Sequence, residues 1–164
     1  MDSYDKAIEQ WREQRPDLDV SPMALFGRAH IVGRLISNFY EESCRPFGLK
    51  ASDFFLLSEL RRSGKPYLLT PRELTNVLVR SSGGMTRQLD NLEKRGLISR
   101  VPDAIDRRSI GVQLTKDGLK LVDQALTAHV DNEAQALKGL SKKDLEALIE
   151  NQKTLIEILR AAGL

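Results

Sequence analysis

A short stretch near the middle of the chain combines small polar residues with one strong cation. It reads Ser81-Ser82-Gly83-Gly84-Met85-Thr86-Arg87, and the spacing of the apolar residues that follow predicts that it opens a helix. Serine hydroxyls and helix N-terminal amides bind phosphates, and a glycine has no Cβ to keep a sugar-phosphate backbone away. Arginine can contact a guanine edge through two hydrogen bonds, and a threonine methyl can contact thymine. The residues that together favour DNA recognition are Ser81, Ser82, Gly83, Thr86 and Arg87.

A second polar segment, residues 102–109, joins two runs in which apolar and polar residues alternate. The runs 97–101 and 110–114 have the period of two that is typical of strands, so they predict a β-hairpin with a long charged turn. A narrow minor groove attracts arginine, and Arg107 and Arg108 are the candidates for that contact. Asp106 is expected to orient a neighbouring arginine. Charged turns are common in hairpins that face solvent, so the assignment of this segment to a DNA contact depends on the helix before it.

The positive charge of the chain is concentrated where these two segments lie. The 164 residues include 25 Lys and Arg against 23 Asp and Glu, a net charge of +2. Between Arg61 and Arg108, 11 basic residues stand against 5 acidic ones, which leaves +6 there and −4 in the rest of the chain. A basic middle between more acidic ends predicts a surface that faces a polyanion.

Helices of suitable length are expected around both segments. Apolar spacing and breaker residues predict helices over 2–14, 21–44, 52–62, 70–79 and 82–95, a short extended piece at 65–69, and two further helices towards the C-terminus. The expected N-caps are Ser21, Ser52, Thr70, Thr115 and Ser141. In helix 82–95, the side that carries Met85, Leu89 and Leu92 should pack inward. Two short helices followed by a charged hairpin form the order of a winged helix-turn-helix.

These motifs together resemble the MarR family of bacterial transcription regulators. The resemblance rests on the run 81–89, on Leu92-Glu93-Lys94-Arg95-Gly96-Leu97-Ile98, on Asp106-Arg107-Arg108-Ser109 and on Leu114-Thr115-Lys116-Asp117-Gly118, and it covers nearly the whole chain. It implies a mainly α fold with a small β-wing, and a homodimer that represses by occupying a pseudopalindromic operator in double-stranded DNA. It also places Ser81, Ser82, Thr86 and Arg87 in a recognition helix, and Asp106 and Arg107 in the wing.

The resemblance implies a division of the chain into three parts within one compact unit. Residues 1–48 are N-terminal helices that contribute to dimerisation, 49–115 are the winged helix-turn-helix that binds DNA, and 116–164 are C-terminal dimerisation helices. The broad apolar face of the last helix and Trp11 on the first independently favour a partner chain, because excess apolar surface usually meets another protein. A two-fold dimer would then contact two half-sites about one helical turn apart.

The N-terminal part narrows the resemblance to the urate-responsive, PecS-like branch of the family. The segments that carry it are Trp11, Asp17-Leu18-Asp19, Ser21-Pro22-Met23, Gly27-Arg28 and Lys65-Pro66-Tyr67. That branch uses a tryptophan, an aspartate and arginines to sense an anionic ligand. Trp11 and Arg62 are therefore candidate effector-binding residues, with packing as the alternative role for Trp11. Phe55 stands where the aspartate is expected, which argues against urate, so the implied effector is a small organic molecule, aromatic or anionic.

Cys44 is the only cysteine, which excludes an intrachain disulfide. An oxidant-sensing thiol at this position is the alternative regulatory device within the same fold. Glu41 and Glu42 would raise the pKa of the thiol, while Arg45 would lower it. A structural cysteine is the favoured interpretation.

Other classes of function have less support in the sequence. His30 and His129 are isolated, and the chain has no phosphate loop, dinucleotide fingerprint or nucleophile elbow, so we expect no catalysis, no metal site and no cofactor. A winged helix that contacts only proteins is a further alternative. Such a module would lack basic side chains that can extend to DNA, whereas this sequence has Arg87, Lys94, Arg107 and Arg108. The polar N-terminus and the lack of a run of about 20 apolar residues predict a cytoplasmic protein with no membrane partner.

Overall fold

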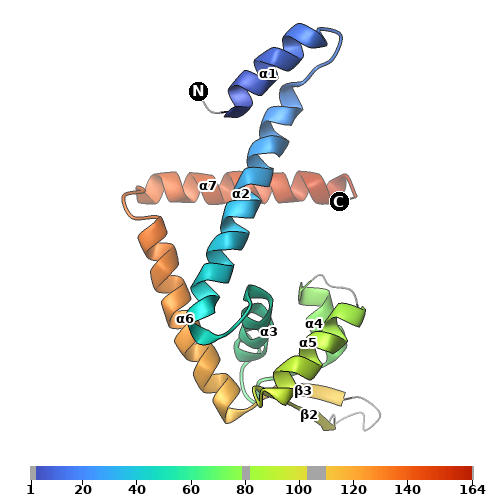
Figure 1. Ribbon diagram of the computed structural model, residues 1–164, viewed down its shortest axis with the longest axis vertical. Helices are drawn as coiled ribbons and strands as arrows, with labels where there is room; N and C mark the ends of the chain where they lie inside the picture. Colours follow the sequence, from blue (N-terminus) through green and yellow to red (C-terminus); the bar gives the residue numbers. More distant parts are fainter. Residues whose placement is uncertain (1–2, 79–81, 103–109, 164) are drawn as a thin grey trace. The chain divides into compact units, whose positions relative to one another are not determined.

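The computed structural model describes residues 3–78, 82–102 and 110–163, which are mainly helical with one small sheet (Figure 1). The chain divides into two compact units, residues 1–129 and 130–164. In chain order the elements are α1 (Ser3–Gln14), α2 (Ser21–Cys44), the 3₁₀ turn η1 (Arg45–Phe47), α3 (Ala51–Arg62), β1 (Leu68–Leu69), α4 (Pro71–Leu78), α5 (Ser82–Lys94), β2 (Ile98–Pro102), β3 (Ile110–Leu114), α6 (Lys116–Ala136) and α7 (Lys142–Ala161). The expected mainly α fold with a small β-wing is confirmed. No helix in the described ranges is both long and apolar enough to cross a bilayer.

The sheet of the first unit is antiparallel, and its strands lie in the order β1-β3-β2. The central strand β3 pairs with β1 through Leu69 and Val112 and with β2 through Arg100 and Val112. Val112, which pairs with both neighbouring strands, is fully buried in the core. The expected hairpin is therefore confirmed, and the short extended piece before α4 adds a third strand to it.

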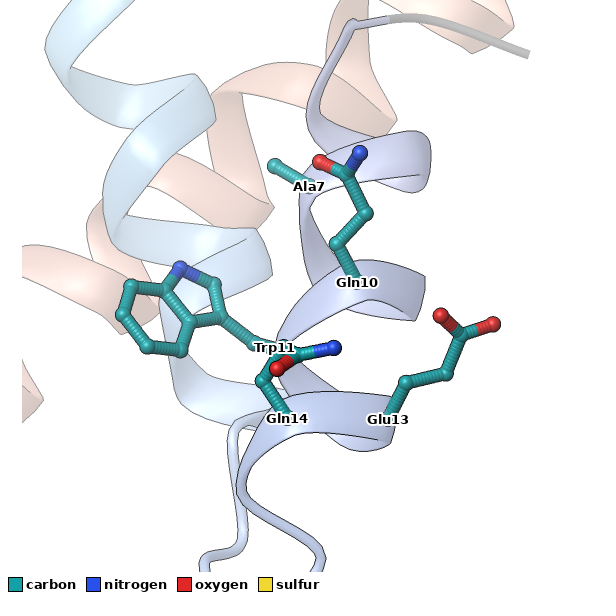
Figure 2. Close-up of a pocket in the computed structure, with 5 residues that line it drawn as sticks. All are labelled: Ala7, Gln10, Trp11, Glu13 and Gln14. Atoms are coloured by element: carbon teal, nitrogen blue, oxygen red, sulfur yellow. The ribbon is translucent and has the colours of Figure 1, made fainter.

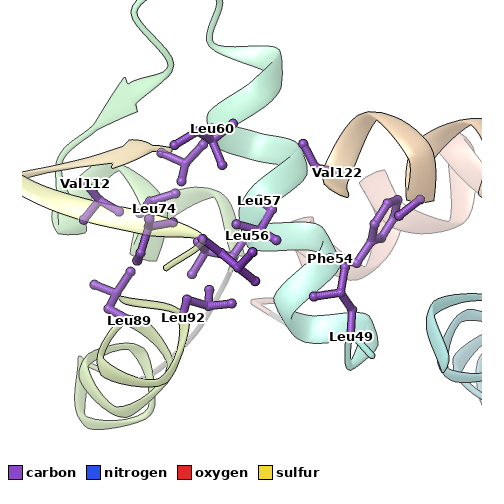
Figure 3. Packing of buried hydrophobic residues seen from close by; sticks show 14 of the residues in the cluster. Leu49, Phe54, Leu56, Leu57, Leu60, Leu74, Leu89, Leu92, Val112 and Val122 are labelled. Carbon is purple, nitrogen blue, oxygen red and sulfur yellow. The ribbon is translucent and has the colours of Figure 1, made fainter. Parts of the chain in front are cut away.

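Helix α3 lies at the centre of the hydrophobic core of this unit. Leu56, Leu57 and Leu60 are fully buried, and they meet Leu74 of α4, Leu89 and Leu92 of α5, Val112 of β3 and Val122 of α6 (Figure 3). Burying one such side chain contributes about 1.5–3 kcal/mol relative to leaving it exposed. The helix-turn-helix α4–α5, the hairpin and the start of α6 thus all pack against helix α3.

Three of the expected N-caps close their helices with side-chain hydrogen bonds. Thr70 and Glu73 form a capping box, in which the Thr70 amide donates to Glu73 Oε2 at 2.7 Å and the Glu73 amide donates to Thr70 Oγ1 at 3.2 Å. The Gly118 amide donates to Thr115 Oγ1 at 3.0 Å, and the Asp144 amide donates to the Ser141 hydroxyl at 3.1 Å. These caps fix the first residues of α4, α6 and α7.

The other two expected N-caps are wrong, because carboxylates from outside the helix take that role. Ser21 is the first residue of α2, and its amide donates to Asp19 Oδ1 at 2.9 Å. Helix α3 begins at Ala51, before Ser52, and the Ala51 amide donates to Glu41 Oε2 at 3.2 Å. The first contact lowers the pKa of Asp19, since hydrogen bonds from the Ser21 amide stabilise its charged form. Capping by Glu41 ties the end of α2 to the start of α3.

Gly118, in the first turn of α6, lies against the backbone of the segment that joins α5 to β2. A Cβ at this position would stand 1.9 Å from the carbonyl oxygen of Leu97. Only a residue without a side chain lets α6 approach so closely. The glycine of the Leu114–Gly118 motif is therefore required by packing.

We expect Gly118→Ala to destabilise the protein by about 2–3 kcal/mol, because backbone atoms must move to make room for the methyl group. Gly33→Ala is the matched control, since a Cβ at Gly33 of α2 meets nothing within 4 Å in the chain. Alanine there should leave stability unchanged or raise it by up to about 1 kcal/mol. Urea unfolding of the two variants measures both effects, and equal midpoints would contradict the close approach at Gly118.

Candidate nucleic-acid interface

Helix α5 has one buried side and one exposed side. Met85, Leu89 and Leu92 are buried in the core, as the spacing predicted. Thr86 and Arg87 are exposed, and so are Asn91 and Lys94 further along the helix. Packing of the apolar side therefore directs a row of hydrogen-bonding and cationic side chains away from the core.

Part of the predicted DNA-binding set lies outside the described residues. This holds for Ser81, Asp106, Arg107 and Arg108. Helix α5 begins at Ser82, so the backbone of Ser82 and Gly83 belongs to its first turn, while the side chain of Ser82 is outside the description. The geometry of the interface therefore rests on Thr86 and Arg87 and on the strands β2 and β3.

Arg100 of β2 joins the hairpin to α5, a role that the sequence alone did not predict. Its Nη2 donates to Asp90 Oδ1 at 2.6 Å and its Nη1 to Glu93 Oε2 at 2.5 Å, while its amide donates to Glu93 Oε1 at 3.1 Å. These contacts, led by the hydrogen bond to Asp90, raise the pKa of Arg100. The ion pairs also offset two carboxylates that would otherwise repel phosphates near the exposed side of α5.

A cavity of about 410 Å³ opens where α4, α5 and the two hairpin strands meet. Pro71 and Thr75 line it from α4, Thr86 from α5, Arg100 from β2 and Ile110 from β3. Thr86 thus borders both the exposed side of α5 and this cavity. Arg100, which connects α5 to the hairpin, is therefore accessible from this cavity.

A buried polar contact joins α5 to the start of α3. Gln88 is 8% exposed, and its Nε2 donates to the Ser52 carbonyl at 2.7 Å and to Asp53 Oδ1 at 3.0 Å. Arg95 donates from Nη2 to the Gly48 carbonyl at 2.9 Å and pairs with Asp53 Oδ2 at 3.5 Å. The sequence did contain a signal for Gln88, because it occupies the i+3 position of the inward stripe that begins at Met85.

The two predicted effector residues lie in different surroundings. Trp11 is 47% exposed and lines a cavity of about 460 Å³ with Ala7, Gln10, Glu13 and Gln14. Figure 2 shows the indole projecting to one side of α1 and the Glu13 carboxylate to the other. Arg62 is at the C-terminal end of α3, where its guanidinium pairs with Glu59. Arg62 is not among the residues that line the cavity at Trp11.

Phe55, at the position where the PecS-like pattern has an aspartate, belongs to an aromatic cluster. Its ring meets Tyr40 edge-on at 5.1 Å between centroids and meets Phe54 at 5.6 Å. His129 of α6 joins the same cluster, 4.8 Å from Phe54 and 5.1 Å from Tyr40. This side of α3 is therefore an aromatic contact with α2 and α6.

Comparison with known proteins identifies the group to which this architecture belongs. Residues 47–109 match the profile of the MarR family. The chain is 37% identical to the HTH-type transcriptional regulator PecS of Dickeya dadantii (strain 3937) over 137 residues, which is 84% of this chain and 82% of PecS. The chain belongs to the MarR family. The resemblance to the PecS-like branch is also confirmed.

Solved structures of MarR-family proteins have the same fold. A cysteine-to-serine mutant of MarR from E. coli, in complex with operator DNA, superposes with a TM-score of 0.72 at 27% identity, over 83% of this chain and 96% of that one. AbsC from Streptomyces coelicolor superposes with a TM-score of 0.76 at 24% identity, over 88% and 97% of the two chains, which shows the fold alone. PecS, the curated relative of this MarR-family chain described above, is named as a transcriptional regulator.

Cys44, the possible redox site of this MarR-family protein, is 2% exposed. Burial, with the nearby charges of Glu41 and Asp53, raises the pKa of its thiol to about 11. Arg45, which was expected to lower the pKa of the thiol, forms an ion pair with Glu42. Burial and a raised pKa are the properties of a structural cysteine, because the reactive form of a cysteine is the thiolate.

We expect Cys44 to resist alkylation by iodoacetamide at pH 7 in the folded protein. A pKa of about 11 leaves on the order of one thiolate in ten thousand, and burial blocks access to it. Mass spectrometry of timed samples measures the modified fraction, with protein in denaturant as the control that should react readily. Rapid labelling of the native protein would restore the oxidant-sensing alternative.

Proposed function

We propose that this protein is a DNA-binding transcription regulator that acts as a repressor and is released from its operator by a small organic effector. The single observation that carries the DNA-binding part is the two-sided helix α5, whose apolar side is buried while Thr86 and Arg87 are exposed beside a hairpin. An α-helix fits the major groove, where each base pair presents its own pattern of hydrogen-bonding groups. The MarR mutant that matches this chain was solved with operator DNA, which supports the same use of the fold here.

The proposed contacts divide into those that position the protein and those that read sequence. Ser82 and Gly83 of the first turn of α5, with Ser81 before them in the sequence, suit phosphates, whereas Thr86 and Arg87 suit base edges. The wing residues Asp106, Arg107 and Arg108 complete the proposed set, with the arginines directed to the minor groove. Wing contacts of this kind would extend the footprint on each side of the major-groove contact.

We also propose that the protein works as a homodimer through residues 1–48 and 116–164, with 49–115 as the DNA-binding part. Exposed apolar side chains are frequent on the helices of the first and last segments. On α2 they are Met23, Leu25, Phe26, Val32, Leu35 and Ile36, and on α7 they are Leu148, Ile149, Ile156 and Ile158. Helix α7 has no buried residue of its own, so its apolar face gains from a partner.

Selection of bound duplexes from a random DNA pool tests both proposals at once. A dimer with two reading helices should enrich an inverted repeat whose half-site centres lie about one helical turn apart. Arg87→Ala should then weaken binding to the selected site by about 1–3 kcal/mol and relax the preference at one base pair of each half-site. Lys120→Ala is the control, because it removes one exposed cation from α6, a helix that carries none of the proposed DNA contacts.

The outcome also separates DNA recognition from a module that contacts only proteins. A DNA-binding protein should lose affinity steeply as salt rises, because cations on the protein displace counterions from phosphates. No enrichment of any sequence, together with no salt-dependent retention of DNA, would refute the proposed function. A single unrepeated site would keep DNA binding and refute the dimer.

The proposed effector is an aromatic or anionic small molecule with Trp11 and Arg62 as its proposed contacts, of which Trp11 lines the cavity described above. The cavity at Trp11 offers an indole face together with the amides of Gln10 and Gln14. Phe55 contributes an aromatic ring in place of a carboxylate, which disfavours a site tuned to the charge of urate. Release from DNA requires that the effector bind one conformation more tightly than the other, because only differential affinity shifts the equilibrium.

Trp11 is the only tryptophan, so its fluorescence reports directly on the proposed site. We expect some members of a panel of aromatic acids and phenols to change Trp11 emission and to release a labelled operator over the same concentration range. Arg62→Ala should weaken the response to the acids. Arg45→Ala is its matched control, since both arginines are exposed and each pairs with a glutamate three residues earlier. Equal loss in the two variants would argue against a specific role for Arg62.

A further inference from the structure

The first unit has an acidic side chain in its interior. Asp53 is 4% exposed, although it lies in the first turn of α3 and carries a carboxylate. An ionised carboxylate out of water is costly unless hydrogen bonds and an opposite charge compensate it. Its side-chain partners within the described part of the chain, Gln88 and Arg95, both come from the region of α5.

We propose that Asp53 is a positioning residue that fixes the rotation of α5 and thereby the aim of Arg87 at the DNA. This inference rests on the proposed DNA-binding function. It assigns no contact with DNA to Asp53 itself. The carboxylate acts through Gln88 and Arg95, which hold the reading helix against the start of α3.

The two partners hold α5 at two points along its length. Gln88 is in the middle of the helix and Arg95 follows its last residue, so seven residues, or roughly 10 Å of helix, separate them. Gln88 also donates to the Ser52 carbonyl, and Arg95 to the Gly48 carbonyl, so both contacts include backbone that does not move with a side chain. Attachment at two separated points opposes both rotation and sliding of the helix.

Apolar packing alone does not give this control. The leucines between α3 and α5 stabilise the contact, but the hydrophobic effect is non-directional. Hydrogen bonds weaken steeply when the donor, hydrogen and acceptor depart from a straight line, so a buried set of them selects one orientation. The orientation of α5, which apolar contacts such as those of Leu56 and Leu89 leave open, is fixed by the polar contacts of Asp53 with Gln88 and Arg95.

A small rotation of α5 has a large effect at its exposed side. At the roughly 6 Å radius of a helix with its side chains, a rotation of about 20° moves a side-chain tip by about 2 Å. That displacement is enough to break the hydrogen bonds of Arg87 to a base edge, whereas flexible contacts to phosphates can adjust. Base contacts carry specificity and phosphate contacts carry general affinity. Loss of the Asp53 contacts should therefore reduce specificity selectively.

The test is Asp53→Asn, measured on the selected operator and on a scrambled duplex of the same length. The asparagine amide places a donor where either Gln88 or Arg95 now finds an acceptor. We expect roughly tenfold weaker binding to the operator, comparable to one mismatched base pair. Affinity for the scrambled duplex and the dependence of binding on salt should be unchanged, a combination that partial unfolding would not produce.

A double-mutant cycle with Arg87→Ala tests the route of the effect. If Asp53 acts by aiming Arg87, then Asp53→Asn should cost operator affinity in the wild-type protein and almost nothing in the Arg87→Ala background. Additive losses would overturn the proposal. Asp123→Asn is the control, because Asp123 pairs with Arg61 of the same helix α3 at 2.7 Å but lies on α6. It should leave the specificity ratio unchanged.

Arg95→Met provides a second variant in case Asp53→Asn lowers stability too far. It keeps a long apolar side chain, removes both donors and affects a side chain that is already 32% exposed. It should shift specificity in the same direction. Wild-type specificity in both Asp53→Asn and Arg95→Met, with loss in Arg87→Ala, would refute the positioning role and leave the proposed function intact. Absence of operator preference in the wild-type protein would refute both.

Discussion

The packing of one face of α5 against α3 is the constraint on which the rest of the first unit depends. A helix of 13 residues cannot bury all its sides in so small a core, so burial of Met85, Leu89 and Leu92 obliges Thr86 and Arg87 to face outward. The same fully buried leucines of α3 also hold α4, β3 and α6. Exposure of the side of α5 that carries Thr86 and Arg87 is thus a direct consequence of how the core forms.

Polar contacts add what the apolar core lacks, which is orientation. Arg100 joins the hairpin to Asp90 and Glu93, and the Asp53 contacts join the opposite side of α5 to α3. The first set is half exposed and adds little to stability, since ion pairs in water contribute about 0–1 kcal/mol. These ion pairs instead fix the orientation of strand β2 relative to helix α5. Helix α5 is therefore held on two sides by charged residues, Arg100 and Asp53, that are not among the proposed DNA contacts.

The sequence predicted the elements well because their signals are local. The capping box at Thr70, the positive φ of Gly96 after α5 and the alternation in β3 each act within a few residues. The sequence did not predict the caps of α2 and α3. Asp19, rather than Ser21, accepts from the first amide of α2, and Glu41 accepts from the first amide of α3 across ten residues. Contacts such as Arg100 with Asp90, or Asp53 with Arg95, depend on tertiary approach across 10 and 42 residues. Only the polar residue at an inward position, Gln88, indicated that a buried partner existed.

Helix α3 also connects the reading helix with the helices proposed to dimerise and to sense an effector. On one side its Asp53 holds α5, and on the other Phe54 and Phe55 pack against Tyr40 of α2 and His129 of α6. Arg61, which pairs with Asp123 of α6 and stacks on Tyr67, adds a third link to the segment before β1. Closely packed aromatic contacts transmit displacement because interiors have low compressibility. A ligand that moved α2 or α6 would therefore move α3, and the contacts at Asp53 would carry that motion to the orientation of Arg87.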